Sequence, residues 1–184
     1  MSLYYLISQL PSLDGIGETE PLPITEEAFL ELCSRFLGKE GYRRLQNLSL
    51  TPPRAGSAVG SRLLDAWNQN QRLLRLALGV VRSARLGKPF DTDNMIIPAP
   101  LTQAAQAAVG MEDPLAAERY LNQYRMTYLE QLRPLDSFCE DTVMYYGLKL
   151  KLLLRMRQFD AAKGWKAYRN IYNSILNGDS QENE

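Results

Sequence analysis

Residues 137–159 read SFCEDTVMYYGLKLKLLLRMRQF, and apolar side chains point in almost every direction around a helix of this sequence. At 100° per residue one face holds Phe138, Tyr145, Leu148, Leu152 and Phe159. That face is widened by Tyr146, Leu150, Leu153 and Leu154, and only a narrow strip is suited to water, through Gly147, Lys151, Arg155 and Gln158. Because a helix that is apolar around most of its circumference is normally buried, this stretch predicts the central helix of the fold.

The same stretch is long enough to be considered as a membrane span. Two acids, two lysines and two arginines lie within it, and each charge at the centre of a bilayer costs about 2.5 to 3.5 kcal/mol. We therefore interpret it as a buried helix. Ser137 and Glu140 have the spacing of a capping box, Asp136 is an alternative cap, and Pro134 ends the preceding element.

The remaining sequence predicts a mainly α fold in one domain. Its 184 residues, 45% of them hydrophobic, are ordinary for a single core. We expect about six to seven helices in residues 1–178 and a flexible polar tail at 179–184. The helix starts that have clear N-caps are at Thr25, Ser61 and Asp113, the last with Pro114 at the first helical position. Gly38 is the predicted stop of the first of these helices, and a final helix is expected from Ala161 to Leu176.

The N-terminal segment is the exception to this helical pattern. Leu3, Tyr5 and Ile7 alternate with other side chains up to Pro11, a period of two that indicates a short extended segment. A lone strand is unstable, and the comparable piece of chain is Met95–Ile97.

Sequence features that would indicate catalysis are weak. The chain has no histidine, the commonest general base and metal ligand near neutral pH, and its two cysteines, Cys33 and Cys139, form no metal-binding pattern. Residues 56–61 resemble a phosphate-binding loop but lack the lysine of a P-loop. We expect no catalytic residues, no metal and no cofactor. The first ten residues lack the basic start of a signal peptide, so a cytoplasmic location is expected.

A group of arginines on the helix from Ser61 to about Leu86 is the candidate partner-binding site. We call it the arginine face, and it consists of Arg72, Arg75, Arg82 and Arg85. Charges balance overall at 21 basic and 21 acidic residues, so this excess is local. The face suits an acidic protein surface, although nucleic acid or simple solvation remain alternatives. A recognition helix and interleaved exposed aromatics are missing, which disfavours nucleic acid.

Several separated positions together resemble a small uncharacterised family encoded beside the subunits of bacterial V-type (archaeal-type) ATPases. They are Tyr4, Tyr5, Leu6, Ser8, Leu10 and Pro11; Glu27, Phe29 and Leu30; Trp67, Leu74, Arg75 and Arg82; Pro114, Leu115 and Glu118; and Tyr146, Leu148, Lys149, Leu150, Phe159 and Asp160. The resemblance implies a helical, non-catalytic component, similar to the C (d) subunit that joins the central stalk to the membrane ring.

Three classes of function follow from these observations. The resemblance implies a structural or accessory subunit of a proton- or sodium-translocating V-type ATPase, held at the membrane through that complex. Composition alone fits a general cytoplasmic helical adaptor. An enzyme with an unrecognised site is the third class, and a deep pocket with convergent polar groups would favour it.

Overall fold

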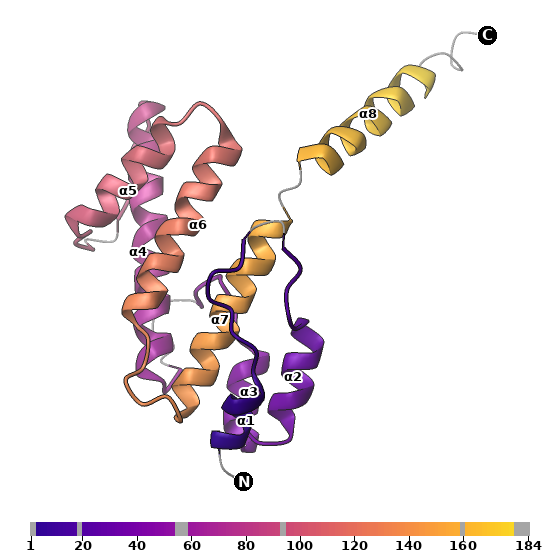
Figure 1. Cartoon of the computed structure of the whole chain (residues 1–184). Coiled ribbons are helices and arrows are strands. Elements are labelled where there is room, and N and C mark those ends of the chain that lie inside the picture. The colour runs from indigo at the N-terminus through magenta and orange to yellow at the C-terminus, as the bar shows by residue number, and fades with distance from the viewer. Residues whose placement is uncertain (1–2, 18–19, 54–58, 93–94, 159–160, 179–184) are drawn as a thin grey trace.

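The computed structural model describes residues 3–17, 20–53, 59–92, 95–158 and 161–178 (Figure 1). Its helices are α1 (Leu3–Gln9), α2 (Glu26–Ser34), α3 (Lys39–Gln46), α4 (Arg62–Arg85), α5 (Ala99–Gly110), α6 (Pro114–Gln131), α7 (Glu140–Arg157) and α8 (Ala161–Gly178). These ranges contain eight helices and no strand, so the mainly α prediction is confirmed with more helices than expected. The tail predicted at 179–184 and Phe159 lie outside the described residues.

Helix α7 occupies the centre of the molecule, as residues 137–159 predicted. It contacts α6 and α4 on one side and α3 on the other, and Figure 1 shows it between these two groups. Leu148 and Leu152 are fully buried, and Leu150 and Tyr145 are nearly so. The apolar circumference is therefore covered because neighbours pack against α7 from opposite sides.

Gly147 corrects the predicted polar strip, because it is buried. A Cβ atom at this position would lie 2.8 Å from Leu48 Cδ2 and 3.3 Å from side-chain atoms of Leu45 and Phe29. The missing side chain allows α2 and α3 to pack closely on α7. Gly147 thus belongs to the core and not to the solvated strip.

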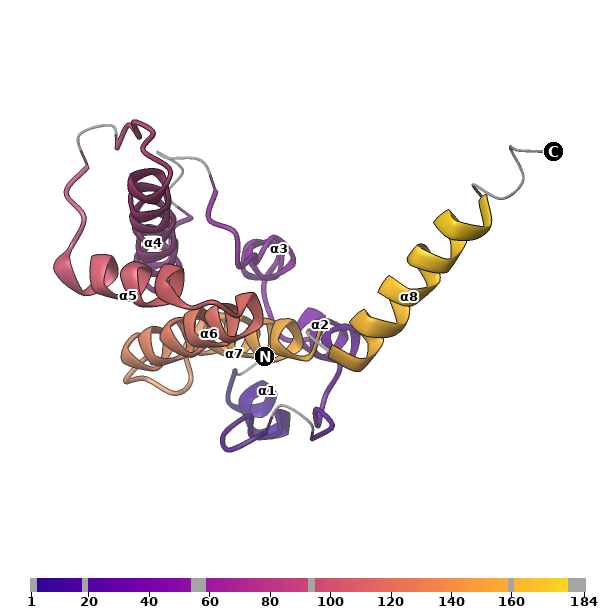
Figure 2. The ribbon, with the colours of Figure 1, turned by 90° about the horizontal axis from the view of Figure 1, so that it is seen from above.

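The core has two parts that are joined along α4. The first half of α4, with Leu64 and Trp67, packs with α1, α2, α3 and α7. Its second half, with Leu74 and Leu78, packs with α5 and α6 around Leu121. Figure 2 shows α5 and α6 alongside α4, on the opposite side of the molecule from α2.

Local capping explains where three of the helices begin. The side chain of Thr25 accepts a hydrogen bond from the Ala28 amide, and that of Ser61 accepts one from Leu64. Asp113 accepts from two amides at the start of α6. These predicted starts are confirmed, whereas the first helix ends at Ser34, before Gly38, which is instead the residue preceding α3.

Three further predictions about local structure were wrong. The N-terminal segment is helix α1, because Leu3, Leu6, Ile7 and Leu10 also have helical spacing and all four reach the core. At the start of α7 the capping box does not form, since Cys139 is the N-cap and makes no side-chain cap hydrogen bond. Asp136 instead accepts a hydrogen bond from the Phe138 amide, and Phe138 is 48% exposed rather than buried.

Helix α8 projects away from the other helices. It follows α7 in the chain and projects outward in both views (Figures 1 and 2). Its described side chains, at residues 164–174, are all exposed. None of the helices in the described ranges combines the length and the hydropathy that a segment crossing a bilayer needs.

Candidate functional site

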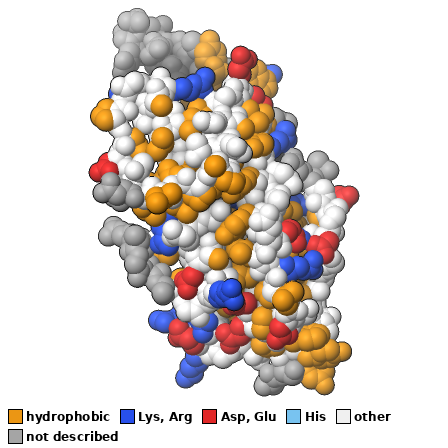
Figure 3. Space-filling model, turned by 90° about the vertical axis from the view of Figure 1, so that its left-hand side faces the viewer, with side chains coloured by type: hydrophobic (Ala, Val, Ile, Leu, Met, Phe, Trp, Pro, Cys, Tyr) orange, Lys and Arg blue, Asp and Glu red, His pale blue; other side chains and the backbone are white. Residues whose placement is uncertain are grey.

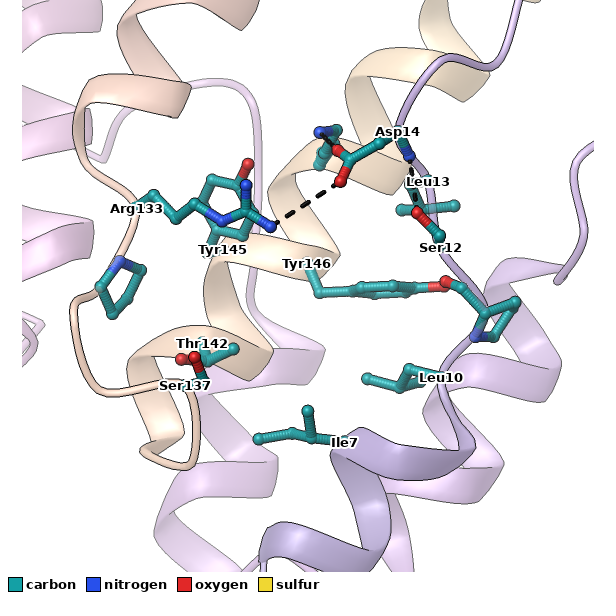
Figure 4. A pocket seen from close by; sticks show the side chains of 13 residues that line it. Ile7, Leu10, Ser12, Leu13, Asp14, Arg133, Ser137, Thr142, Tyr145 and Tyr146 are labelled. Carbon is teal, nitrogen blue, oxygen red and sulfur yellow. Dashed lines mark hydrogen bonds and ion pairs between the residues drawn. The ribbon is translucent and has the colours of Figure 1, made fainter.

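A pocket of about 240 Å³ lies between the segment after α1 and the connection from α6 to α7 (Figure 4). Its floor is α7, which contributes Tyr145, Tyr146 and Lys149. Asp14 comes from the N-terminal side and Arg133 from the end of α6. Binding sites for drug-sized molecules usually enclose about 300 to 1,000 Å³, so this pocket is small.

Lys149 is the buried charge at this site. Its ammonium group donates to Asp14 and to Glu130 Oε1, the latter at 2.5 Å, while its side chain is only 9% exposed. Burial acts to lower the pKa of Lys149, but the two hydrogen bonds outweigh burial, and the pKa lies above the ordinary lysine value. The residue is therefore a charged, doubly paired lysine.

The two carboxylates respond to Lys149 in the opposite direction. The hydrogen bond from Lys149 is the main cause that lowers the pKa of Asp14. For Glu130, burial works to raise the pKa, but Lys149 and neighbouring groups lower it overall. Arg133 adds weaker ion pairs, with its Nη2 3.7 Å from Asp14 Oδ2 and its Nη1 4.0 Å from Glu130 Oε2.

Two tyrosines complete the pocket. Tyr146 lies across it in Figure 4 and donates from its hydroxyl to the Pro11 carbonyl, at 2.9 Å. Burial raises the pKa of Tyr145 to about 12, and that of Tyr146 likewise to about 12. Both hydroxyls thus stay protonated near neutral pH. The arrangement ties the N-terminal segment, α6 and α7 together, and each charged side chain lining it has an oppositely charged partner.

The four members of the predicted arginine face differ in exposure and in their partners. Arg75 and Arg82 are exposed on α4. Arg72 is partly buried and its Nη2 donates to Gln69 Oε1 at 2.9 Å, while Arg85 donates to the Val109 carbonyl of α5. Arg85 is nevertheless exposed, and Arg75 also donates within the molecule, from its Nη2 to Thr51 Oγ1 at 3.3 Å. Three members of the face are therefore exposed, and one, Arg72, is partly buried. Partner binding by these residues stays a prediction.

Three arginines from different helices form what we call the arginine cluster: Arg75 of α4, Arg125 of α6 and Arg155 of α7. Glu118 Oε2 lies 3.2 Å from Arg155 Nη2 and 3.9 Å from Arg125 Nη1. Burial lowers the pKa of Arg125, and the positive charges of Arg155 and Arg75 act in the same direction. Glu118 is thus shared by Arg125 and Arg155, while Arg75 acts on Arg125 through its charge.

Neither Lys149 nor Arg125 was predicted as a site residue, although each leaves a signal in the sequence. Lys149 interrupts the apolar circumference of α7 between Leu148 and Leu150, where a buried cation needs an acid. On α6, Glu118, Asn122, Arg125 and Leu129 share one helical face, and Asn122 and Leu129 are fully buried. Arg125 also donates to Gln71 Oε1 of α4 at 3.1 Å, which places it in the interface.

The described residues hold no group of three or more His, Cys, Asp or Glu side chains that could bind a metal ion. Burial raises the pKa of the Cys33 thiol to about 12. Figure 3 shows the side of the molecule that carries α4, α5 and α6, where hydrophobic side chains gather across the middle and charged ones near the lower end.

Residues 102–179 match a family described as a protein of unknown function (DUF2764). The matched range covers most of α5 and all of α6, α7 and α8. It therefore includes the central helix, two members of the arginine cluster and the projecting helix. No curated protein and no solved structure matches the chain.

Proposed function

We propose that the chain is a non-catalytic accessory subunit of a V-type (archaeal-type) ATPase, acting in the cytoplasm through contacts with other protein subunits. The observation that carries this proposal is the grouping of arginine side chains from three helices near Arg75. Arg75 is exposed on α4, it belongs to the arginine cluster, and Arg82 follows it about two turns along the same helix. Such a surface suits an acidic protein partner, because complementary potentials steer association and set orientation.

The pocket supports the same proposal, because its polar groups are already paired within the chain. Lys149, Asp14, Glu130 and Arg133 are paired with one another, and Tyr146 donates to a backbone carbonyl. Groups engaged in this way hold segments of the chain in place. The choice of a V-type ATPase as the complex rests on the sequence resemblance, and the helical fold agrees with a stalk-associated component.

The experiment is co-purification with ATPase subunits from native membranes, at low and high salt. The variant is Arg75→Glu with Arg82→Glu, and the matched control is Lys39→Glu with Arg62→Glu, which changes net charge equally at exposed first residues of α3 and α4. We expect the variant to lose the ATPase subunits and the control to keep them. Both should melt normally, since exposed substitutions change stability by about 0.5 kcal/mol or less each.

Two results would contradict the proposal. Recovery of the ATPase subunits with the Arg75, Arg82 variant at low salt would remove this surface from the interface. Capture of other proteins without any ATPase subunit by the unmodified chain would favour the general helical adaptor instead.

A further inference from the structure

Helix α8 exposes apolar side chains along one side, and all of its charged residues are basic. Its sequence contains Lys163, Lys166 and Arg169 and no aspartate or glutamate. Trp165, Tyr168, Ile171 and Tyr172 are 59%, 56%, 61% and 50% exposed. Large apolar side chains this exposed, lying along one helix, require an explanation in terms of a surface that covers them.

The apolar residues of α8 form one continuous stripe. Positions 165, 168 and 172 are three or four residues apart and so lie on the same side of the helix. Their rings follow one another, with Trp165 and Tyr168 stacked at 5.4 Å between centroids and Tyr168 and Tyr172 at 6.2 Å. Lys166 and Arg169 lie to one side of the stripe, and Arg169 Cζ is 5.9 Å from the centre of the Trp165 ring.

We propose that α8 lies flat on an anionic lipid surface. Its aromatic and aliphatic stripe enters the boundary between headgroups and acyl chains, while Lys166 and Arg169 meet the anionic headgroups. Helices that bind in this way have basic residues on the polar face and residues such as Trp and Leu on the other. Trp and Tyr favour the depth of the headgroups, because they join a large ring to a polar group.

The charge of α8 favours an anionic lipid surface over a second copy of the chain as the partner of the stripe. Two α8 helices packed through their stripes would bring six basic residues together with no acid on either helix. A lipid surface supplies the missing negative charge at every position along the helix. A broad planar partner also suits the placement of α8, which stands clear of the other helices (Figures 1 and 2).

The test uses the purified full-length chain without any ATPase subunit, so its outcome is independent of the function proposed above. Flotation is compared for vesicles of phosphatidylcholine alone and of phosphatidylcholine mixed with phosphatidylserine, at low and high salt. We expect binding to the mixed vesicles, weakened by salt. Trp165 fluorescence should shift to the blue on binding, whereas the other tryptophan, Trp67, is 1% exposed and should not respond.

Two variants separate the apolar and electrostatic contributions. Trp165→Ser with Tyr168→Ser removes part of the stripe, and Lys166→Glu with Arg169→Glu reverses two charges. The charge variant should reduce binding to the mixed vesicles at least about tenfold, since a base near an anionic surface contributes about 1 kcal/mol. The stripe variant should reduce it at least as much, since binding also scales with the apolar area that enters the boundary. The controls are Ile96→Ser, at a side chain 90% exposed outside α8, and Lys39→Glu with Arg62→Glu, and both should bind like the unmodified chain.

The proposal is overturned if the chain floats with neither vesicle, or equally with both. It is also overturned if the Trp165, Tyr168 variant turns a dimer into a monomer in light scattering, because a second copy would then cover the stripe. Loss of a co-purifying acidic protein in that variant, with vesicle binding unchanged, would assign the stripe to a protein partner.

Discussion

Helices α7 and α8 are each 18 residues long and follow one another in the chain, yet they lie in opposite environments. Helix α7 is apolar around most of its circumference and packs against α3, α4 and α6. Helix α8 has apolar residues along one side, and its described side chains are all exposed. The comparison shows that the width of the apolar surface, more than its presence, places a helix inside the core.

The two helices also differ in how they carry positive charge. Lys149 of α7 is buried between two carboxylates, so its charge is neutralised within the fold. Lys166 and Arg169 of α8 are exposed, and that helix contains no acid. Charge on α7 therefore contributes to the tertiary structure, whereas charge on α8 is available to something outside the molecule.

The largest expected difference between the helices is the loss of stability when an aspartate is placed in each. Leu152 of α7 is 0% exposed, so Leu152→Asp should unfold the chain, because a buried carboxylate without a partner costs several kcal/mol, about 4 or more. Ile171→Asp on α8 should change stability by about 0.5 kcal/mol or less. Thermal melting of both variants checks this. A similar loss in the two would show that α8 is packed like α7.

Removal of the acids around Lys149 should have the next largest effect. Asp14→Asn with Glu130→Gln leaves a buried ammonium group without a carboxylate, and we expect a loss of about 2 to 3 kcal/mol, below the full cost of a broken buried pair because both acids are partly exposed. The matched control is Glu31→Gln, whose pair with Arg35 is exposed and should contribute about 0.5 kcal/mol. Urea unfolding measures both. Adding Lys149→Met should recover much of the loss, and no recovery would contradict this account.

Alanine substitutions at two glycines test how tightly each helix is packed. A Cβ at Gly147 would come within 2.8 Å of Leu48, so Gly147→Ala should destabilise the chain by about 1 to 2 kcal/mol. Gly164 of α8 has nothing within 4 Å of such an atom, so Gly164→Ala should be neutral or favour the helix by up to about 1 kcal/mol. Equilibrium unfolding would contradict the assignment if Gly147→Ala were as well tolerated as Gly164→Ala.

The smallest expected effect is on the pH dependence of stability. The pKa values of Asp14 and Glu130 lie below their ordinary values of 3.8 and 4.5. Their contribution is thus complete above those values and is lost as the pH falls through the lowered pKa values of the folded chain. We expect less than about 1 kcal/mol from each carboxylate, because both are more than a third exposed. Acid melting curves of the Asp14, Glu130 variant should be flatter, and identical curves would contradict this.

The sequence predicted features that depend on local spacing and missed those that depend on distant partners. Thr25, Ser61 and Asp113 cap helices through amides two or three residues away. By contrast, Lys149 finds Asp14 at a separation of 135 residues. Phe138 was wrongly assigned to the core because the predicted cap at Ser137 does not form, and α7 begins only at Glu140.

The N-terminal segment and the arginine face show the same limit. In α1 a period of two, through Tyr5, and a helical period, through Leu6, fit the same segment. Contact with the core decided between them, since Leu6 is buried and Tyr5 is exposed. On α4, the spacing placed four arginines together. In the structure Arg85 bonds to α5, and Arg75 acts together with Arg155 of α7 on Arg125 of α6. The surface around Arg75 therefore depends on tertiary packing that the spacing along one helix does not contain.

Hydrogen exchange of the free full-length chain tests the contrast between α7 and α8 most directly. Amides in the core of a fold exchange only through global unfolding, whereas an isolated helix opens locally. We expect the amides of α7 around Leu148 and Leu152 to be the slowest in the molecule and those of α8 around Tyr168 to exchange far faster. Protection of α8 equal to that of α7 in the free chain would contradict the account, because the stripe of α8 would then be covered within the fold.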